Sequence, residues 1–369
     1  MIIFGILKKF FFILDHWIPA PTISAVEMHQ DCRKFARKYN FIHDIGMDKG
    51  ICHQVLPEMG FARPGMLIVG SDSHTITYGA FNSLSIGIGA TNVSVVFTTG
   101  KLWFKVPESF EINLSGKLNK GVMPKDFILK LIGDISTKGA IYKSLEFHGD
   151  GAKSLSIDGR MTISNMVVEA GAKFGIFLPD EKVNDWLHNR TNETYEFVFP
   201  DKDALYEKSF DYNLSEITPV VAKPSTPDNL AYIEEVEGIE FDQAFIGSCT
   251  NVRMEDLRIA AKILKGKKIS SKMRMIIIPA SKEIYKAAFH EGLIEIFINA
   301  GAIFGHSTCG PCFGGHMGVL GPDEICISSS NRNFEGRMGS PRSKVYLATP
   351  ATIAASAIRG KITDPREVL

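Results

Sequence analysis

The stretch AFIGSCTNVRMEDLRIAAKILK, residues 244–265, indicates the fold class of the chain. Its first residues, 244–247, form a short apolar run typical of a buried strand, and residues 254–265 have helical periodicity that Gly266 ends. The polar sequence Ser-Cys-Thr-Asn lies between the two, where open α/β sheets place their functional loops. The stretch therefore predicts an α/β fold with a site in the loop after this strand.

The same alternation of strand-like and helix-like segments extends in both directions. Upstream, Ser24 and Glu27 at capping-box spacing predict a helix over residues 24–39. Further helices are expected at residues 124–135 and 162–170, and a strand at 66–70. Downstream, we expect strands at residues 275–278 and 325–328, one long helix at 281–299, and a last helix that Thr349 and Pro350 open.

Two segments of the sequence indicate domain boundaries. Val106-Pro107-Glu108 ends a glycine-rich block, and residues 218–229 carry three prolines, a pattern typical of a linker. We expect three units, at residues 1–107, 108–222 and 223–369.

Composition excludes several classes of protein. The 369 residues include 41 Lys and Arg and 41 Asp and Glu, so the net charge is zero and argues against binding nucleic acid through overall charge. The apolar start, residues 1–14, is interrupted by two lysines, is shorter than a membrane span, and precedes no cleavage site. We interpret it as a core strand and expect a cytoplasmic protein with no membrane partner.

Six cysteines are too few for a secreted disulfide scaffold, and only Cys309 and Cys312 have the spacing of a reactive or ligating pair. Cys309-Gly-Pro-Cys312 has the form of a redox dithiol, although Phe-Gly-Gly after it starts a helix poorly. With His306 and His316 it also forms H-x2-C-x2-C-x3-H, which could close a zinc site. A third interpretation adds Cys249: three thiolates from two loops suit an iron–sulfur cluster with one iron left open to substrate.

The residues around these cysteines carry a family resemblance. Gly247-Ser-Cys-Thr-Asn251, Cys309-Gly-Pro-Cys312 and Asn331-Arg-Asn-Phe-Glu-Gly-Arg337 resemble aconitase superfamily motifs, in that family's order. Gly70-Ser-Asp-Ser-His-Thr75 and Gly50-Ile-Cys-His-Gln54 match as well, so the resemblance covers nearly the whole chain. It is nearest to the large subunits of two-subunit isopropylmalate dehydratases, with homoaconitases second.

The resemblance implies three-layer α/β/α domains around one 4Fe-4S cluster held by Cys249, Cys309 and Cys312. It also implies a hydro-lyase that removes water from a hydroxy-acid and adds it back on the neighbouring carbon. The acid–base groups would be three carboxylate–histidine pairs, since a carboxylate raises the pKa of a neighbouring imidazole. These pairs are Asp15 with His16, His53 with Asp72, and His74 with Glu169.

A second group of residues would bind the substrate. Arginine binds carboxylates bidentately, so Arg332 and Arg337 suit a small di- or tricarboxylate. Ser73 and Asn331 are expected to hydrogen-bond the substrate or the cluster. Asn165 lies four residues before Glu169 on the helix expected there, so the two should share a face.

The resemblance implies that the base for the carbon-bound proton lies outside this chain. In the family it is a serine on a swivelling domain, so the resemblance implies a separate small subunit that supplies this serine and the substrate-selecting loop. Family members also carry several tens more residues before the motif that Asp15-His16 matches, so we expect a first domain truncated at its N-terminus. Alternatives from other classes are an RNA-binding regulator without a cluster and an inactive paralogue.

Overall fold

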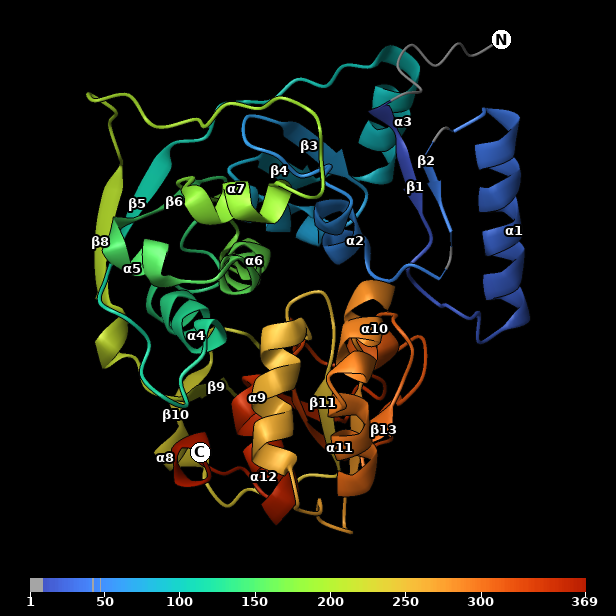
Figure 1. Cartoon of the computed structure of the whole chain (residues 1–369), viewed down its shortest axis with the longest axis vertical. Coiled ribbons are helices and arrows are strands. Elements are labelled where there is room, and N and C mark those ends of the chain that lie inside the picture. Colours follow the sequence, from blue (N-terminus) through green and yellow to red (C-terminus); the bar gives the residue numbers. More distant parts are fainter. Residues whose placement is uncertain (1–8, 42, 47) are drawn as a thin grey trace.

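The structure, a computed structural model, describes residues 9–41, 43–46 and 48–369. Part of the apolar start therefore lies outside the described residues, and β1 spans Phe11–Ile13 within the rest of it. The described elements form four sheets, of two, two, four and seven strands. They follow one another along the chain in three groups (Figure 1).

The first group holds two small parallel sheets, β1 with β2 and β3 with β4. Its elements are β1 Phe11–Ile13, α1 Ile23–Lys38, β2 His43–Ile45, α2 Cys52–Glu58, β3 Leu67–Gly70, η2 Ser73–Phe81, β4 Leu84–Gly87 and α3 Ala90–Thr99. Thr22 caps α1, because its Oγ1 atom accepts the Ala25 backbone N–H at 3.2 Å. The cap is therefore not Ser24. The predicted capping box is thus wrong, because Ser24 already lies inside the helix.

The second group is built on a four-stranded, all-parallel sheet in the order β7-β6-β5-β8. Its elements are β5 Ser109–Ser115, α4 Pro124–Ile135, β6 Ser144–His148, α5 Gly149–Ser154, α6 Ile157–Met166, η3 Val167–Ala170, β7 Phe174–Phe177, α7 Glu181–Leu187, β8 Lys208–Asn213 and η4 Leu214–Glu216. The helix expected at residues 162–170 is the end of α6 followed by the tighter turn η3.

The third group forms a seven-stranded sheet in the order β10-β9-β15-β14-β11-β12-β13, parallel from β15 to β13. Its elements are β9 Val220–Ala222, β10 Leu230–Tyr232, α8 Ile233–Val236, β11 Gln243–Ile246, α9 Met254–Leu264, β12 Arg274–Ile277, α10 Lys282–His290, α11 Leu293–Ala300, β13 Ile303–Phe304, η5 Gly310–Phe313, β14 Ile325–Ser328, β15 Lys344–Leu347, α12 Pro350–Arg359 and η6 Pro365–Glu367.

Two expectations for this region are corrected. Strand β9 lies inside the proline-containing segment 218–229 and β10 directly follows it, so the segment interpreted as a linker contributes to the sheet, and β9 pairs with β10 and β15. The single helix predicted at residues 281–299 is two helices, because Gly292 between them adopts φ of +71°, outside the helical region.

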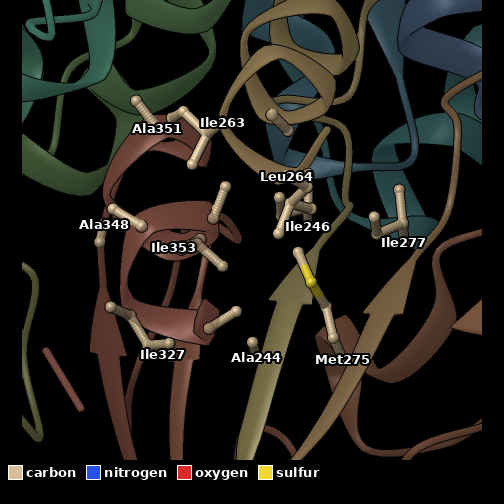
Figure 2. Packing of buried hydrophobic residues seen from close by; sticks show 14 of the residues in the cluster. Ala244, Ile246, Ile263, Leu264, Met275, Ile277, Ile327, Ala348, Ala351 and Ile353 are labelled. Atoms are coloured by element: carbon tan, nitrogen blue, oxygen red, sulfur yellow. The ribbon is translucent and has the colours of Figure 1, made fainter. Parts of the chain in front are cut away.

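The core of the third group lies between the sheet and the helices α9, α11 and α12 (Figure 1). Alternate residues of β11, Ala244 and Ile246, face Ile263, Leu264 and the residues of α12 (Figure 2). Phe245 points to the opposite face and packs with residues of the second group, so one strand belongs to two cores. Side chains on both faces of β11 are therefore buried, and this burial anchors the loop that follows the strand.

Candidate active site

Three cysteines come together from two loops of the third group. Cys249 follows β11, Cys309 directly precedes η5 and Cys312 lies on η5. Burial raises the pKa of the Cys309 thiol well above its usual range, and the neighbouring Asp15, Cys312 and Cys249 raise it further. Burial also raises the pKa of Cys249 to about 12, with Asp72 and Cys312 adding to the effect. These mutual effects mean that the three thiols lie near one another; that they bind one common group stays a prediction.

Polar groups surround these thiols. The side-chain amides of Asn165 and Asn331 each donate to Cys249 Sγ at 3.3 Å. Cys312 Sγ lies 3.4 Å from Ser248 Oγ and 3.9 Å from a terminal nitrogen of Arg337. Asn331 Oδ1 and Arg337 Nε are buried and have no hydrogen-bond partner among the described residues. Because buried polar atoms are rarely left unpaired, these two atoms point to a further group at the cysteines.

The donor set fits an iron–sulfur cluster better than the two alternatives left open by the sequence. In the described ranges, no three His, Cys, Asp or Glu side chains converge as the ligands of one metal ion. Thiolates that hold a cluster bind separate irons, so they need not converge on one ion. His306 Nε2 instead donates to Ile18 O at 2.7 Å, and His316 Nε2 to Pro19 O at 2.9 Å. These histidines hold a backbone loop, which argues against the zinc interpretation.

The redox interpretation also fits poorly. A redox-active cysteine has a lowered pKa at the start of a helix, but the pKa of Cys309 is raised. The turn after it, η5, is a four-residue 3-10 helix that ends at Gly314 in the left-handed region.

Asp15 and His16 form the predicted pair beside the cysteines. His16 Nδ1–H donates to Asp15 Oδ1 at 2.7 Å, which leaves Nε2 facing Cys309 Sγ at 3.8 Å. Burial lowers the pKa of His16, but the hydrogen bond and charge of Asp15 outweigh burial, so the net shift is upward. The other oxygen of Asp15 accepts the Cys52 backbone N–H at 2.9 Å, which fixes the carboxylate. Asp15 thus holds the His16 imidazole in one orientation at the cysteine site, and the role of His16 as a proton donor stays a prediction.

The other two pairs join into one chain of contacts. His53 Nε2 donates to Asp72 Oδ1 at 2.8 Å, and the same oxygen accepts the His74 backbone N–H at 2.7 Å. His74 Nε2 donates to Glu169 Oε1 at 3.0 Å. Glu169 in turn accepts Arg332 Nε at 2.8 and 3.0 Å. The chain crosses all three groups of the fold, so it forms only when they pack together.

The charges in this chain stabilise one another. Burial pushes the pKa of Asp72 upward, yet the hydrogen bonds from His53 and His74 outweigh burial and hold it far below its usual range. Burial likewise raises the pKa of Glu169 and lowers that of His74, but their contacts reverse both effects, so the pKa of Glu169 falls and that of His74 rises. The contact between Glu169 and His74 therefore favours the charged form of each side chain.

The residues expected to bind substrate take different positions. Arg332 donates from Nε to Glu169, and within the described part of the chain its two terminal nitrogens make no hydrogen bond. Ser73 Oγ lies 3.4 Å from His74 Nδ1. Asn165 and Glu169 do not share an α-helical face as predicted, because α6 ends at Met166 and Glu169 lies on η3. Asn165 reaches Cys249 and Glu169 reaches His74, so the change of helix type directs the two side chains to different partners.

Close backbone approaches hold the loop of Asp72 and His74 in place. A Cβ atom at Gly87 would lie 2.4 Å from Asp72 O, and one at Gly79 would lie 1.9 Å from Gly175 O. Only glycine fits either position, so η2 can pack directly on β4 and β7.

Sequence reasoning missed several residues of the site. Tyr78 Oη donates to Cys52 O at 3.2 Å and lies 3.4 Å from His53 Nδ1. The fully buried Arg253 donates to Cys249 O at 2.9 Å and Thr250 O at 2.7 Å. Lys125 is buried on α4. The sequence offered a signal for this burial, since residues 128, 129 and 132 form an apolar stripe on the helix face that also carries Lys125.

None of the described helices combines the length and apolar character needed to cross a bilayer.

Comparisons with known proteins agree with this geometry. The model of the aconitase family (aconitate hydratase) matches residues 18–360. The 3-isopropylmalate dehydratase large subunit 1 of Methanopyrus kandleri is 48% identical over 98% of this chain and 87% of that protein. The 3-isopropylmalate dehydratase large subunit of Hydrogenobaculum sp. is 50% identical over 98% of this chain and 85% of its own length. A probable methanogen homoaconitase large subunit of Methanosarcina mazei is 51% identical, over 96% and 90%.

A solved structure supports the fold. The holo-form of aconitase X from Thermococcus kodakaraensis matches with a TM-score of 0.55 at 14% identity, over 91% of this chain and 78% of that one. At this identity the likeness concerns the fold alone. The match of the family model over residues 18–360, with relatives about half identical over nearly the whole chain, shows that the chain belongs to the aconitase family.

Proposed function

We propose that this chain is the large subunit of a hydro-lyase that interconverts 2-isopropylmalate and 3-isopropylmalate by dehydration and rehydration. One observation carries the proposal: His16, oriented by Asp15, presents Nε2 to the thiol of Cys309. A proton donor at iron-binding cysteines suits loss of a hydroxyl group. The substrate is suggested by the names of relatives about half identical to this chain.

The cofactor in this proposal is one 4Fe-4S cluster, held by Cys249, Cys309 and Cys312. When bound, such a cluster supplies a Lewis acid for the hydroxyl and carboxylate of the substrate. The amides of Asn165 and Asn331 would hold the Cys249 sulfur in place by the hydrogen bonds that they already make. Of the two unpartnered atoms, Arg337 Nε would donate to a cluster sulfur or a substrate carboxylate, and Asn331 Oδ1 would accept from a substrate hydroxyl group.

The chain's own residues then divide the remaining work. His16 Nε2–H protonates the leaving hydroxyl, which departs as water, and takes the proton back when water adds to the neighbouring carbon. The free terminal nitrogens of Arg332, together with Arg337, bind the substrate carboxylates. Glu169 fixes Arg332 through Nε, so the guanidinium fork keeps one orientation. The His53–Asp72–His74 contacts keep Ser73 and the loop around it in position.

The carbon-bound proton needs a base that we assign to a partner. The relatives are named as large subunits, which implies a small subunit as their partner. We propose that a small subunit with a swivelling domain supplies a serine as the base and the loop that selects the substrate.

Homoaconitase is the second candidate, because relatives at 51% and 48% identity carry that name. Both activities use the same dehydration and rehydration, so this chain's site residues suit either. A small subunit that selects the side chain of the substrate would decide between them.

The experiment is anaerobic co-purification of the chain with a small subunit, followed by assays with isopropylmalate, homocitrate and citrate. We expect brown protein with iron and sulfide, turnover of isopropylmalate by the pair, and none by the isolated chain. Cys249→Ser should lose iron and activity. Cys32→Ser, on the outer helix α1, is the matched control and should keep both.

Other outcomes have distinct meanings. Turnover of homocitrate but not isopropylmalate would favour the second candidate. Efficient turnover by the isolated chain would refute the assigned base, and colourless protein with stoichiometric zinc would refute the cluster. A bound cluster with no turnover of any of the three acids by the pair would favour an inactive paralogue.

A further inference from the structure

Lys125 is an unusual residue of the second group. It lies one residue into α4 and is 0% exposed, on the same helix face as the buried residues Ile128, Leu129 and Ile132. Lysine is rarely buried completely, because removing an ammonium group from water costs free energy unless strong partners replace the water. The partners of Lys125 therefore indicate what it does.

Those partners are carbonyl oxygens of the cysteine site. Lys125 Nζ donates to Ser329 O at 2.5 Å and to Ser330 O at 2.6 Å, and it lies 3.4 Å from Asn251 Oδ1. Among the residues whose side chains are described, no carboxylate lies within ion-pair distance of this nitrogen. The ammonium thus has three oxygen contacts without a directly bound anion.

The contacts join two loops that belong to the site. Ser329 and Ser330 follow β14 and lead directly into Asn331 and Arg332. Asn251 comes two residues after Cys249, and its own amide donates to Asp256 at 3.1 Å. A single side chain from α4 therefore connects the loop of Cys249 to the loop of Asn331, whose amide donates to Cys249.

The electrostatic surroundings of Lys125 also connect it to the cysteine site. Burial lowers the pKa of Lys125 to about 7, and the nearby Asp256, Cys312 and Cys249 oppose that lowering. Two of the three groups are the expected cluster ligands. Three thiolates give a bound 4Fe-4S centre a net negative charge, and a buried cation stabilises such a centre more strongly than an exposed one, because little water screens it.

We propose that Lys125 is a positioning residue of the cysteine site, which holds the Cys249 and Asn331 loops together and acts as the buried counter-charge of the iron–sulfur cluster. The proposal rests on the cluster in the proposed function and is independent of the substrate. It assigns no proton transfer to Lys125.

Lys125→Met, which keeps length and removes charge and donors, is the main test. Lys182→Met is the matched control. Lys182 Nζ also donates to three backbone carbonyls, those of Lys153, Ser154 and Leu155, at 2.6, 3.1 and 2.8 Å. The main electrostatic contributions to the pKa of Lys182 come from burial, Arg160 and Asp180, and not from the cysteine site. The holoprotein of each variant is purified anaerobically, and two quantities are measured: the rate of iron release to a chelator and the reduction potential of the cluster.

We expect Lys125→Met to release iron at least about tenfold faster, equivalent to about 1.4 kcal/mol. The reduction potential should fall, because removing a nearby positive charge disfavours the added electron. Lys182→Met should match the wild type in both. A folded Lys125→Met protein with wild-type release rate and potential would overturn the proposal, and so would equal effects in the two variants.

If Lys125→Met does not fold, Lys125→Arg and Lys125→Gln decide between charge and packing. The proposal requires Lys125→Arg to keep the wild-type potential and Lys125→Gln to lower it. Equal potentials in these two variants would overturn it. If the wild-type chain itself bound no iron, the cluster assignment would fail, whereas absent isopropylmalate turnover with a bound cluster leaves this test intact.

Discussion

Glu169 is the residue on which two cations of the site depend, and Glu169→Gln tests that dependence. Its side chain is 4% exposed and contacts both His74 and Arg332. Removing one partner of a buried ion pair costs about 3–5 kcal/mol, because the remaining charge stays buried without compensation. Glutamine keeps the shape and one acceptor, and the side chain of Arg332 is 22% exposed, so water can partly replace the carboxylate. We therefore expect Glu169→Gln to lower the free energy of unfolding by about 3 kcal/mol.

The control is the same substitution in an exposed pair. Arg258 contacts Glu291 through Nε and a terminal nitrogen, at 2.9 and 2.6 Å, so the hydrogen-bond distances resemble those between Arg332 and Glu169 although the pair is bidentate. The two side chains are 57% and 37% exposed, and a solvated pair of this kind contributes about 0–1 kcal/mol. Glu291→Gln should therefore change the free energy of unfolding by less than about 1 kcal/mol.

The difference in free energy of unfolding between wild type and Glu169→Gln should also depend on pH. The lowered pKa of Glu169 contributes stability that is present above pH 4.5, its ordinary pKa, and is lost as pH falls through the folded value. The raised pKa of His74 contributes stability that is present below pH 6.5 and is lost as pH rises through the folded value. The difference between wild type and Glu169→Gln should therefore be largest between pH 4.5 and 6.5 and smaller on either side.

Urea unfolding of the cluster-free chain, followed by circular dichroism and by tryptophan fluorescence, measures both quantities. Coincident transitions by the two probes establish that one free energy describes the unfolding. A Glu169→Gln variant within 1 kcal/mol of the wild type, or no more destabilised than Glu291→Gln, would refute the buried network. A difference that does not vary with pH would refute the assigned charges of Glu169 and His74.

Three further outcomes are expected. Gly79→Ala should cost about 3 kcal/mol in urea unfolding, because its Cβ would lie 1.9 Å from Gly175 O, whereas Gly89→Ala, with open space around it, should cost about 1 kcal/mol or less; equal losses would show that η2 can shift away from β7. Thr22→Ala should destabilise the chain by about 1 kcal/mol through loss of the α1 cap, and Ser24→Ala should not; the reverse order would restore the predicted capping box. His306→Ala should leave iron and sulfide contents unchanged while lowering turnover, because its imidazole binds Ile18 O beside the loop of His16; loss of metal from a folded variant would make His306 a ligand.

Much of the fold was predictable because it is encoded locally. The apolar run before Gly247 and the periodic residues after Asn251 predict a strand and a helix, and β11 and α9 confirm them. The helix at residues 124–135 is confirmed as α4. Failures arose where the deciding interaction was a backbone conformation. Gly292 interrupts a strongly apolar periodic segment, and the pattern of side chains alone does not report its φ of +71°.

The candidate site shows a clear division between sequence and tertiary structure. The sequence by itself determined the loops and the chemical groups that they carry, because cysteines, carboxylates and histidines occur in local motifs beside predicted strands. Only tertiary structure decided which groups meet: His74 and Glu169 are 95 residues apart, and Glu169 and Arg332 are 163 apart. It also made His306 a support for the loop of His16 and buried Lys125 against Ser329 and Ser330. Such contacts form when separate groups of strands and helices bury their apolar faces together, and local periodicity does not encode that packing.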